Sequence, residues 1–183
     1  METNIEDLDN IIQRAKEGDS KAFDMLYRAY FTPLYRYVFL RMRSKEDTED
    51  VVQDTFYRAY QALPRYEHSK STMLPYLFTI ARNLLINHGK KKRPDVYPAE
   101  DIDRNQGDGD ASDLARAREL KIELQYAMQV LSDIEREVIE LKFFGERSYQ
   151  EIAEVLGKRE DAIRQHVTRA MKKMREQLNK REK

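Results

Sequence analysis

The sequence predicts an all-α fold in which two small helical domains are joined by a flexible acidic linker, the C-terminal domain carrying a helix-turn-helix. Only 6 of the 183 residues are glycine, and strand-like alternation of apolar and polar residues is almost absent. Apolar residues recur instead at intervals of three and four, which is the period of amphipathic helices. We place the domains at residues 1–93 and 114–183 and the linker at residues 94–113.

The amino-acid composition argues against disulfide-bonded, metal-binding and membrane-spanning classes of protein. The chain has no cysteine, which excludes disulfides and thiolate metal sites. The three histidines, His68, His88 and His166, lack ligand spacing, so we expect no metal and no cofactor. No apolar run approaches the roughly 20 residues of a membrane helix, and the acidic N-terminus has no hydrophobic signal segment. We therefore expect a cytoplasmic protein without membrane insertion.

The N-terminal domain should contain four helices. The first helix is expected at Ile5 to Lys16, and the second begins at a cap, Ser20, and carries apolar residues on one face as far as Met42. The third is expected at Asp47 to Leu63, and the fourth runs from near Thr72 towards His88. Pro33 lies inside the second helix and should kink it or force a local rearrangement, since proline lacks the N–H and crowds the preceding turn. Pro75 falls in the first turn of the fourth helix, where the missing N–H has no partner in any case.

The linker, Pro94 to Asp113, holds seven acidic residues against the single Arg104, a formal charge of −6. Gly107 and Gly109 lie among them, and apolar residues are few. Such a composition cannot bury enough surface to offset chain entropy, so the segment should be disordered on its own. A plain solvated tether and a functional acidic segment fit this composition equally well.

The C-terminal domain should contain four helices, the first at Leu114 to Val130. Two capping boxes, Ser132 with Glu135 and Ser148 with Glu151, start the second helix, which runs through Phe143, and the third. Gly145 and Gly157 separate the last three helices from one another. The expected buried stripe of the last helix is Ile163, Val167, Ala170, Met171, Met174 and Leu178.

Positive charge gathers on the last helix and the tail after it. Lys158 to Lys183 holds ten Lys/Arg against four Asp/Glu, a charge of +6, whereas Asp133 to Glu154 holds three against seven, a charge of −4. The whole-chain charge is zero, with 33 residues of each sign, and hides this segregation. A basic amphipathic helix after a glycine turn suits the DNA major groove. Helical bundles that bind nothing share the same pattern, and this alternative stays open.

Four separated stretches resemble one family. They are AFDMLYRAYFTPLYRYV (Ala22 to Val38), DTEDVVQDTFYRAYQAL (Asp47 to Leu63), LPYLFTIARNLLINHGKKKR (Leu74 to Arg93) and the C-terminal helix-turn-helix. Together they resemble the extracytoplasmic-function sigma factors of bacterial RNA polymerase. The resemblance implies a promoter-specificity subunit that partners with core polymerase and promoter DNA, and an anti-sigma factor as a further partner.

The resemblance assigns roles to the N-terminal domain. It implies polymerase contacts at Glu49, Asp50, Gln53 and Asp54, although an acidic solvated face is the ordinary interpretation of such charges. It implies contacts to the single-stranded −10 element at Arg65, Tyr66, Ser71, Tyr76, Arg82, Asn83, Asn87, Lys90, Lys91, Lys92 and Arg93. Basic grooves with aromatic platforms hold unpaired bases. Tyr57 and Tyr60 are further aromatic candidates, with a core position an equal alternative for Tyr60.

In the C-terminal domain the resemblance implies duplex contacts to the −35 element. The residues are Ser148, Arg159, Arg164, Gln165, Thr168, Arg169 and Lys172. The chain departs from the family pattern at Tyr76, where tryptophan is usual, and at Gln165 and His166, where serine and arginine are usual. The departures at Gln165 and His166 imply an atypical −35 sequence, whereas the departure at Tyr76 falls in the part that the resemblance assigns to the −10 element.

Two rival classes remain at the level of sequence. A helix-turn-helix regulator would bind duplex DNA tightly without polymerase, whereas a sigma factor should bind it weakly alone. An enzyme acting on nucleic acid would need clustered carboxylates, metal ligands or an activated nucleophile. Asp47, Glu49, Asp50 and Asp54 are close in sequence, but their spacing spreads them around a helix flank. We therefore expect a protein that is not an enzyme.

Overall fold

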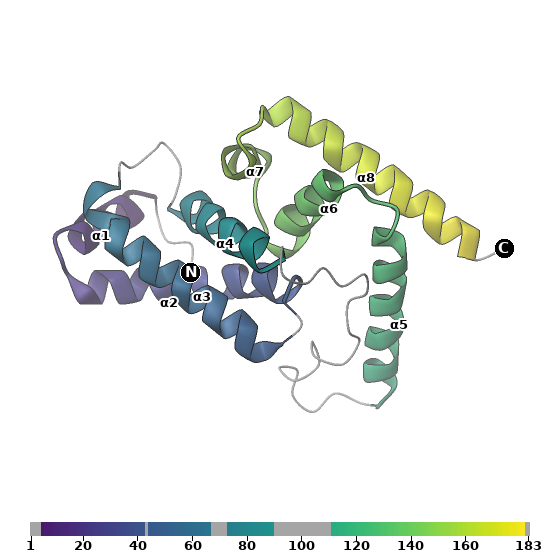
Figure 1. Ribbon diagram of the computed structural model, residues 1–183, viewed down its shortest axis with the longest axis horizontal. Coiled ribbons are helices and arrows are strands. Elements are labelled where there is room, and N and C mark those ends of the chain that lie inside the picture. Colours follow the sequence, from purple (N-terminus) through teal and green to yellow (C-terminus); the bar gives the residue numbers. More distant parts are fainter. Residues whose placement is uncertain (1–4, 43, 67–72, 90–110, 182–183) are drawn as a thin grey trace.

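The computed structural model describes residues 5–42, 44–66, 73–89 and 111–181. Within these ranges every regular element is a helix, and turns and loops connect the helices. An N-terminal group of helices, α1 to α4, lies beside a C-terminal group, α5 to α8 (Figure 1). The all-α prediction is confirmed. None of the described helices combines the length and the apolar character needed to span a bilayer.

The first two helices form a hairpin around a tight turn. α1 spans Ile5–Lys16, as predicted, and α2 spans Ser20–Phe39. Asp19 is the N-cap of α2, because its carboxylate accepts hydrogen bonds from the first backbone N–H groups of the helix. The prediction of Ser20 as the cap was wrong by one residue, since an ionised aspartate is the stronger partner for the positive end of the helix dipole.

Pro33 lies within α2 without ending it, and the helix continues to Phe39. The residues of α2 that face inward are completely or almost completely buried, among them Leu34 and Tyr37. Burial of this face stabilises the helix despite the hydrogen bond that proline removes, because tertiary packing outweighs local propensity. The predicted stripe omitted Tyr37, which is fully buried.

The next helices complete the N-terminal domain. α3 spans Lys45–Ala62, two residues earlier at its start than predicted because Ser44 provides its N-cap, and a short 3-10 turn, η1, follows at Leu63–Arg65. α4 spans Leu74–Gly89. The inward residues predicted for α3 are all buried, namely Val51, Val52, Thr55, Phe56, Ala59 and Leu63.

The first helix of the C-terminal group begins earlier than predicted, and the second ends in a different helical geometry. α5 spans Ala111–Met128, starting three residues before the predicted Leu114. α6 spans Asp133–Ile139 and starts at the predicted capping box of Ser132. It then widens into one π-helical turn, η3 at Glu140–Phe144, where the backbone N–H of Gly145 donates to the carbonyl of Glu140 at 2.9 Å. The helix predicted through Phe143 therefore continues to Phe144, but its last turn is π-helical.

The helix-turn-helix closes the chain. α7 spans Tyr149–Leu156 and α8 spans Glu160–Arg181, with the second predicted capping box present at Ser148. Gly157 between them adopts a left-handed conformation (φ 60°), which glycine reaches without a steric penalty. Met171 was predicted in the buried stripe of α8 but is 42% exposed, so the buried stripe is narrower than the apolar pattern.

The two groups of helices share one hydrophobic core. Phe78 on α4 is fully buried, and its ring lies 5.0 Å from that of Tyr37. A Cβ placed on Gly145 would lie 2.9 Å from the Phe78 ring, closer than real Cβ atoms approach a neighbour. Backbone and aromatic ring therefore meet here at the closest distance that packing permits. This contact joins α4 to the turn before α7.

Glu135 links the capping box of α6 to α8. Its carboxylate accepts from the Ser132 N–H at 2.9 Å and from the Lys173 ammonium at 2.7 Å. Burial raises the pKa of Glu135, but the hydrogen bonds from Lys173 and Ser132 outweigh it and lower the pKa from 4.5 to about 2. A lowered pKa in the folded state contributes stability above pH 4.5 that disappears as pH falls towards 2.

We expect Lys173→Met to lower the thermal midpoint at pH 7 by about 2–4 °C, because Lys173 is half-exposed and solvent limits such a pair to about 1 kcal/mol. The difference from the unsubstituted chain should shrink as the pH approaches 2. Lys172→Met is the matched control, since Lys172 makes only an exposed contact with Glu176 at 3.9 Å. Calorimetry across pH checks both variants. Equal effects of the two substitutions would contradict the assignment.

Candidate nucleic-acid interface

The exposed face of α8 carries most of the residues predicted to contact the −35 element. Arg164, Gln165, Thr168, Arg169 and Lys172 are all exposed. The Thr168 hydroxyl donates to the carbonyl of Arg164 at 2.9 Å, which leaves the hydroxyl able to accept but not to donate. Ser148 is exposed but serves as the N-cap of α7. The structure therefore brings this set together along one side of the helix-turn-helix.

Acidic residues of the first turn of α8 hold the two arginines nearest to it. Arg164 pairs with Glu160 at 2.5 Å and stacks over the Tyr149 ring at 4.4 Å, while Arg159 pairs with Asp161 at 2.7 Å. Such exposed pairs contribute little, in the range of about 0–1 kcal/mol. Both guanidinium groups can therefore exchange their carboxylate for a DNA phosphate or a base edge at small cost. Gln165, which follows Arg164 on α8, is also exposed.

His166 adds no charge to this face at neutral pH. Partial burial lowers its pKa, and the neighbouring charges of Arg169 and Lys158 lower it further. The neutral ring lies 3.3 Å from the guanidinium of Arg169, in hydrogen-bonding distance. A neutral imidazole in this position orients the arginine and does not itself bind phosphate as a cation.

The predicted −10 residues divide into three groups. Tyr66 and Tyr76 lie together, with ring centroids 5.0 Å apart, and Lys16 donates to the Tyr66 carbonyl at 2.8 Å. Arg65, Asn83 and Asn87 are exposed. Ser71, Lys90, Lys91, Lys92 and Arg93 lie outside the described residues.

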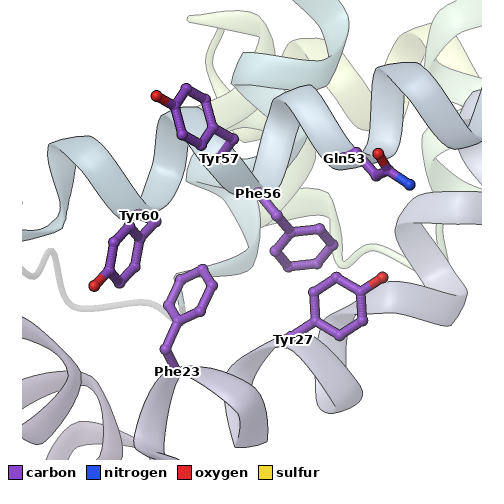
Figure 2. A pocket seen from close by; sticks show the side chains of 6 residues that line it. All are labelled: Phe23, Tyr27, Gln53, Phe56, Tyr57 and Tyr60. Atoms are coloured by element: carbon purple, nitrogen blue, oxygen red, sulfur yellow. The ribbon is translucent and has the colours of Figure 1, made fainter. Parts of the chain in front are cut away.

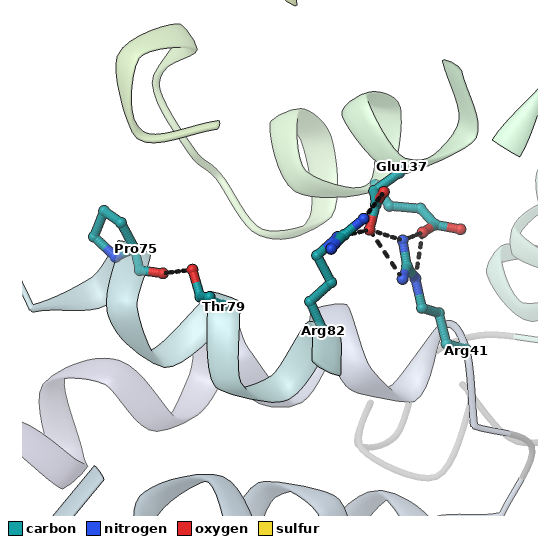
Figure 3. Close-up of polar contacts among 6 residues, drawn as sticks. Arg41, Pro75, Thr79, Arg82 and Glu137 are labelled. Carbon is teal, nitrogen blue, oxygen red and sulfur yellow. Dashed lines mark hydrogen bonds and ion pairs between the residues drawn. The ribbon is translucent and has the colours of Figure 1, made fainter. Parts of the chain in front are cut away.

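Arg82 is the predicted −10 residue with the most distinctive partner. It turns towards the C-terminal domain, where its guanidinium donates to both carboxylate oxygens of Glu137 at 2.7 and 3.3 Å. Arg41 approaches the same Glu137 at 3.4 Å (Figure 3). It also donates to Glu140 at 2.5 Å. Sequence reasoning missed Arg41, Glu137 and Glu140, because no local pattern relates residues about a hundred positions apart.

The predicted polymerase-contacting residues lie on one flank of α3. Asp50 and Gln53 are exposed, Glu49 lies 3.7 Å from Lys45, and Asp54 pairs with Arg58 at 2.8 Å. Of the four, Gln53 borders an apolar groove of about 320 Å³ between α2 and α3. We call this the aromatic groove. Its lining residues are Phe23, Tyr27, Gln53, Phe56, Tyr57 and Tyr60 (Figure 2).

The groove was not anticipated as a site. Tyr57 and Tyr60 are 60% and 46% exposed, so the core alternative for Tyr60 is not supported, although its neighbour Phe23 packs edge-on against it at 4.9 Å. The spacing of Gln53, Tyr57 and Tyr60 places them on one helical face, and this was the available sequence signal. An apolar hollow beside acidic side chains suits a helix that has one apolar face and a basic margin.

Comparisons with known proteins match both groups of helices to one family. Residues 26–94 match Sigma-70 region 2 and residues 121–174 match Sigma-70, region 4. The ECF RNA polymerase sigma factor BldN of Streptomyces coelicolor is 31% identical over 88% of this chain, which spans 62% of BldN. The RNA polymerase sigma factor YlaC of Bacillus subtilis is 34% identical over 72% of this chain and 78% of YlaC.

The fold has a close counterpart among solved structures. CnrH, solved in complex with the cytosolic domain of CnrY, gives a TM-score of 0.69 at 25% identity, covering 92% of this chain and 95% of CnrH. Both sigma-70 regions thus occur here in order, each on one of the two groups of helices. The chain belongs to the sigma-70 family of RNA polymerase sigma factors, in its extracytoplasmic-function group.

Proposed function

We propose that this chain directs core RNA polymerase to specific promoters, with the N-terminal domain docking on polymerase and holding the melted −10 element while the helix-turn-helix reads the −35 element. The observation that carries the proposal is the presence of both sigma-70 regions in one chain. The polymerase supplies the chemistry in the cytoplasm, and this chain selects where it starts. A regulator that binds duplex DNA without polymerase is not favoured, because relatives along most of the chain are named sigma factors.

The acidic flank and the aromatic groove together support the docking role. Tyr57 is the most exposed of the large apolar side chains in the described residues, and a tyrosine in a hollow is the type of residue that dominates binding energy. The acidic side chains around it favour a basic partner and speed its approach. We therefore place the polymerase contact at Gln53, Tyr57 and Asp50.

A further protein partner of the anti-sigma type is also proposed. CnrH, the similar solved structure, was solved in complex with the cytosolic domain of another protein, CnrY. An inhibitor that covered the aromatic groove would compete directly with polymerase, because the groove is a single apolar hollow of about 320 Å³.

A reconstituted transcription assay tests the proposed function. Core polymerase with a randomised promoter library should gain new start sites when this chain is added, and those promoters should share two separated elements. No new start site with any template would contradict the proposal. Duplex binding by the chain alone, as tight as binding by the holoenzyme, would favour the regulator instead.

Tyr57→Ala should weaken binding to core polymerase by about tenfold or more, which corresponds to about 1.4 kcal/mol or more for a hot-spot side chain. The substitution should leave the thermal midpoint nearly unchanged, since Tyr57 is largely exposed. Met25→Ala is the matched control, because Met25 is 48% exposed on α2 and does not line the groove. A fluorescence titration measures both. Equal affinities of the two variants would remove the groove from the interface.

Gln165→Ala should change the preferred base at one −35 position, at a cost of about 1–3 kcal/mol for the preferred sequence. Lys172→Ala should weaken all −35 sequences alike, because an exposed lysine further along α8 is suited to phosphate. Selection from a randomised −35 element with holoenzyme checks both. The recognition face is misplaced if Gln165→Ala weakens every sequence equally.

A further inference from the structure

We propose that the free chain is self-inhibited by an acidic clasp, Glu137 and Glu140 of the C-terminal domain, which grips Arg41 and Arg82 of the N-terminal domain. The inference rests on the proposed function, because Arg82 is the residue assigned to −10 DNA. It adds a closed state in which the C-terminal domain occupies that residue in the place of nucleic acid.

The four side chains of the clasp are largely buried and form a connected network of ion pairs. Glu140 is 1% exposed, and the side chains of Glu137, Arg41 and Arg82 are 11%, 19% and 29% exposed. Glu137 takes a two-pronged contact from Arg82 and a longer one from Arg41, which also reaches Glu140 (Figure 3). Removal of one partner would leave a buried charge without compensation, which is strongly unfavourable.

Cation–π and apolar contacts beside the clasp support the same arrangement; those of Arg147 and Gly145 with Phe78 cross between the domains, whereas that of Arg41 with Tyr37 lies within the N-terminal domain. Arg41 also lies over the Tyr37 ring at 4.8 Å, and Arg147 lies over the Phe78 ring at 5.5 Å. Gly145 meets Phe78 so closely that no side chain fits between them. At the rim, Arg36 pairs with Glu146 in an exposed contact at 2.8 Å. The interface is therefore close-packed at its centre and weakly paired at its margin.

The closed arrangement engages part of the surface assigned to single-stranded DNA, since Arg82 is bonded to Glu137 while Arg65, Asn83 and Asn87 stay exposed. Helix α7 packs on α4, the helix that carries Tyr76 and Arg82. Burial, and then the negative charge of Glu154 on α7, raise the pKa of Tyr66, which places an acidic side chain near the tyrosine pair. A phosphate backbone approaching these residues would meet the carboxylates of the clasp and of α7. The closed chain therefore excludes the ligand by charge as well as by volume.

Arginine makes the exchange between the two states possible. A guanidinium binds a carboxylate and a phosphate with the same two-pronged geometry. Glu137 thus offers Arg82 the kind of anion that DNA offers, at the cost of keeping the two domains together. Opening must break the clasp, and DNA phosphate then replaces the lost carboxylate. Two domains held side by side also cannot occupy separated promoter elements at once.

Energy transfer between two dyes tests the closed state without polymerase. The chain has no cysteine, so Asn10→Cys and Gln150→Cys, at exposed positions of α1 and α7, provide specific labelling sites, one in each domain. In this labelled chain, Glu137→Gln with Glu140→Gln should lower the transfer efficiency. Glu146→Gln is the matched control, since its pair with Arg36 is exposed, and it should leave the efficiency unchanged.

Polymerase affinity supplies the functional readout. The apparent dissociation constant of a chain that must open equals its intrinsic value divided by the open fraction. The double glutamine variant should therefore bind core polymerase several-fold to tenfold more tightly than the unsubstituted chain, and Glu146→Gln should stay within about twofold. Far-UV circular dichroism verifies the helical content. If the double variant does not fold, Arg41→Gln tests the same clasp from the N-terminal domain.

Unchanged energy transfer and unchanged affinity in a folded clasp variant would overturn the inference. A different outcome is high energy transfer in the unsubstituted chain, lost in the clasp variant, with no binding of polymerase by either chain. That outcome would support the clasp and contradict the proposed function. A fall in transfer efficiency when polymerase is added to the unsubstituted chain is expected if both hold. The two failures are therefore distinguishable.

Discussion

Two arginines of the N-terminal domain face two buried glutamates of the C-terminal domain, and the position of the two domains' proposed binding surfaces relative to each other depends on this contact. Arg82 would be a free cation for DNA if Glu137 were not bonded to it at 2.7 Å. The contact also sets which faces stay open. The recognition face of α8 and the aromatic groove remain exposed, whereas the Tyr66 and Tyr76 pair lies on the side of α4 that α7 approaches.

Interactions between near neighbours in the chain could be predicted from sequence. Both capping boxes, the bounds of α1 and the inward residues of α3 follow from spacings of three and four, and the structure has them. Local competition explains the small errors. Asp19 replaces Ser20 as the cap of α2 because a charged acceptor one residue earlier is available, and Met171 stays exposed because the partners of α8 cover only a narrow stripe.

Interactions between distant residues could not be predicted. Nothing near Arg41 in sequence indicates Glu140, and nothing near Phe78 indicates that Gly145 must lack a side chain. The π-helical turn has the same origin, since it forms where the end of α6 meets the N-terminal domain. Of the site, the exposed face of α8 and the acidic flank of α3 were correctly placed on the surface, while the aromatic groove and the engagement of Arg82 required the tertiary structure.

The proposed function places the two domains on separated promoter elements, whereas the structure of the chain alone holds them side by side (Figure 1). Small-angle X-ray scattering of the free chain in dilute solution tests that claim most directly. We expect a radius of gyration close to the value of about 16 Å for a compact chain of this length, and a distance distribution with a single maximum. A clearly larger radius with a two-lobed distribution, typical of two separated domains on a tether, would contradict the account.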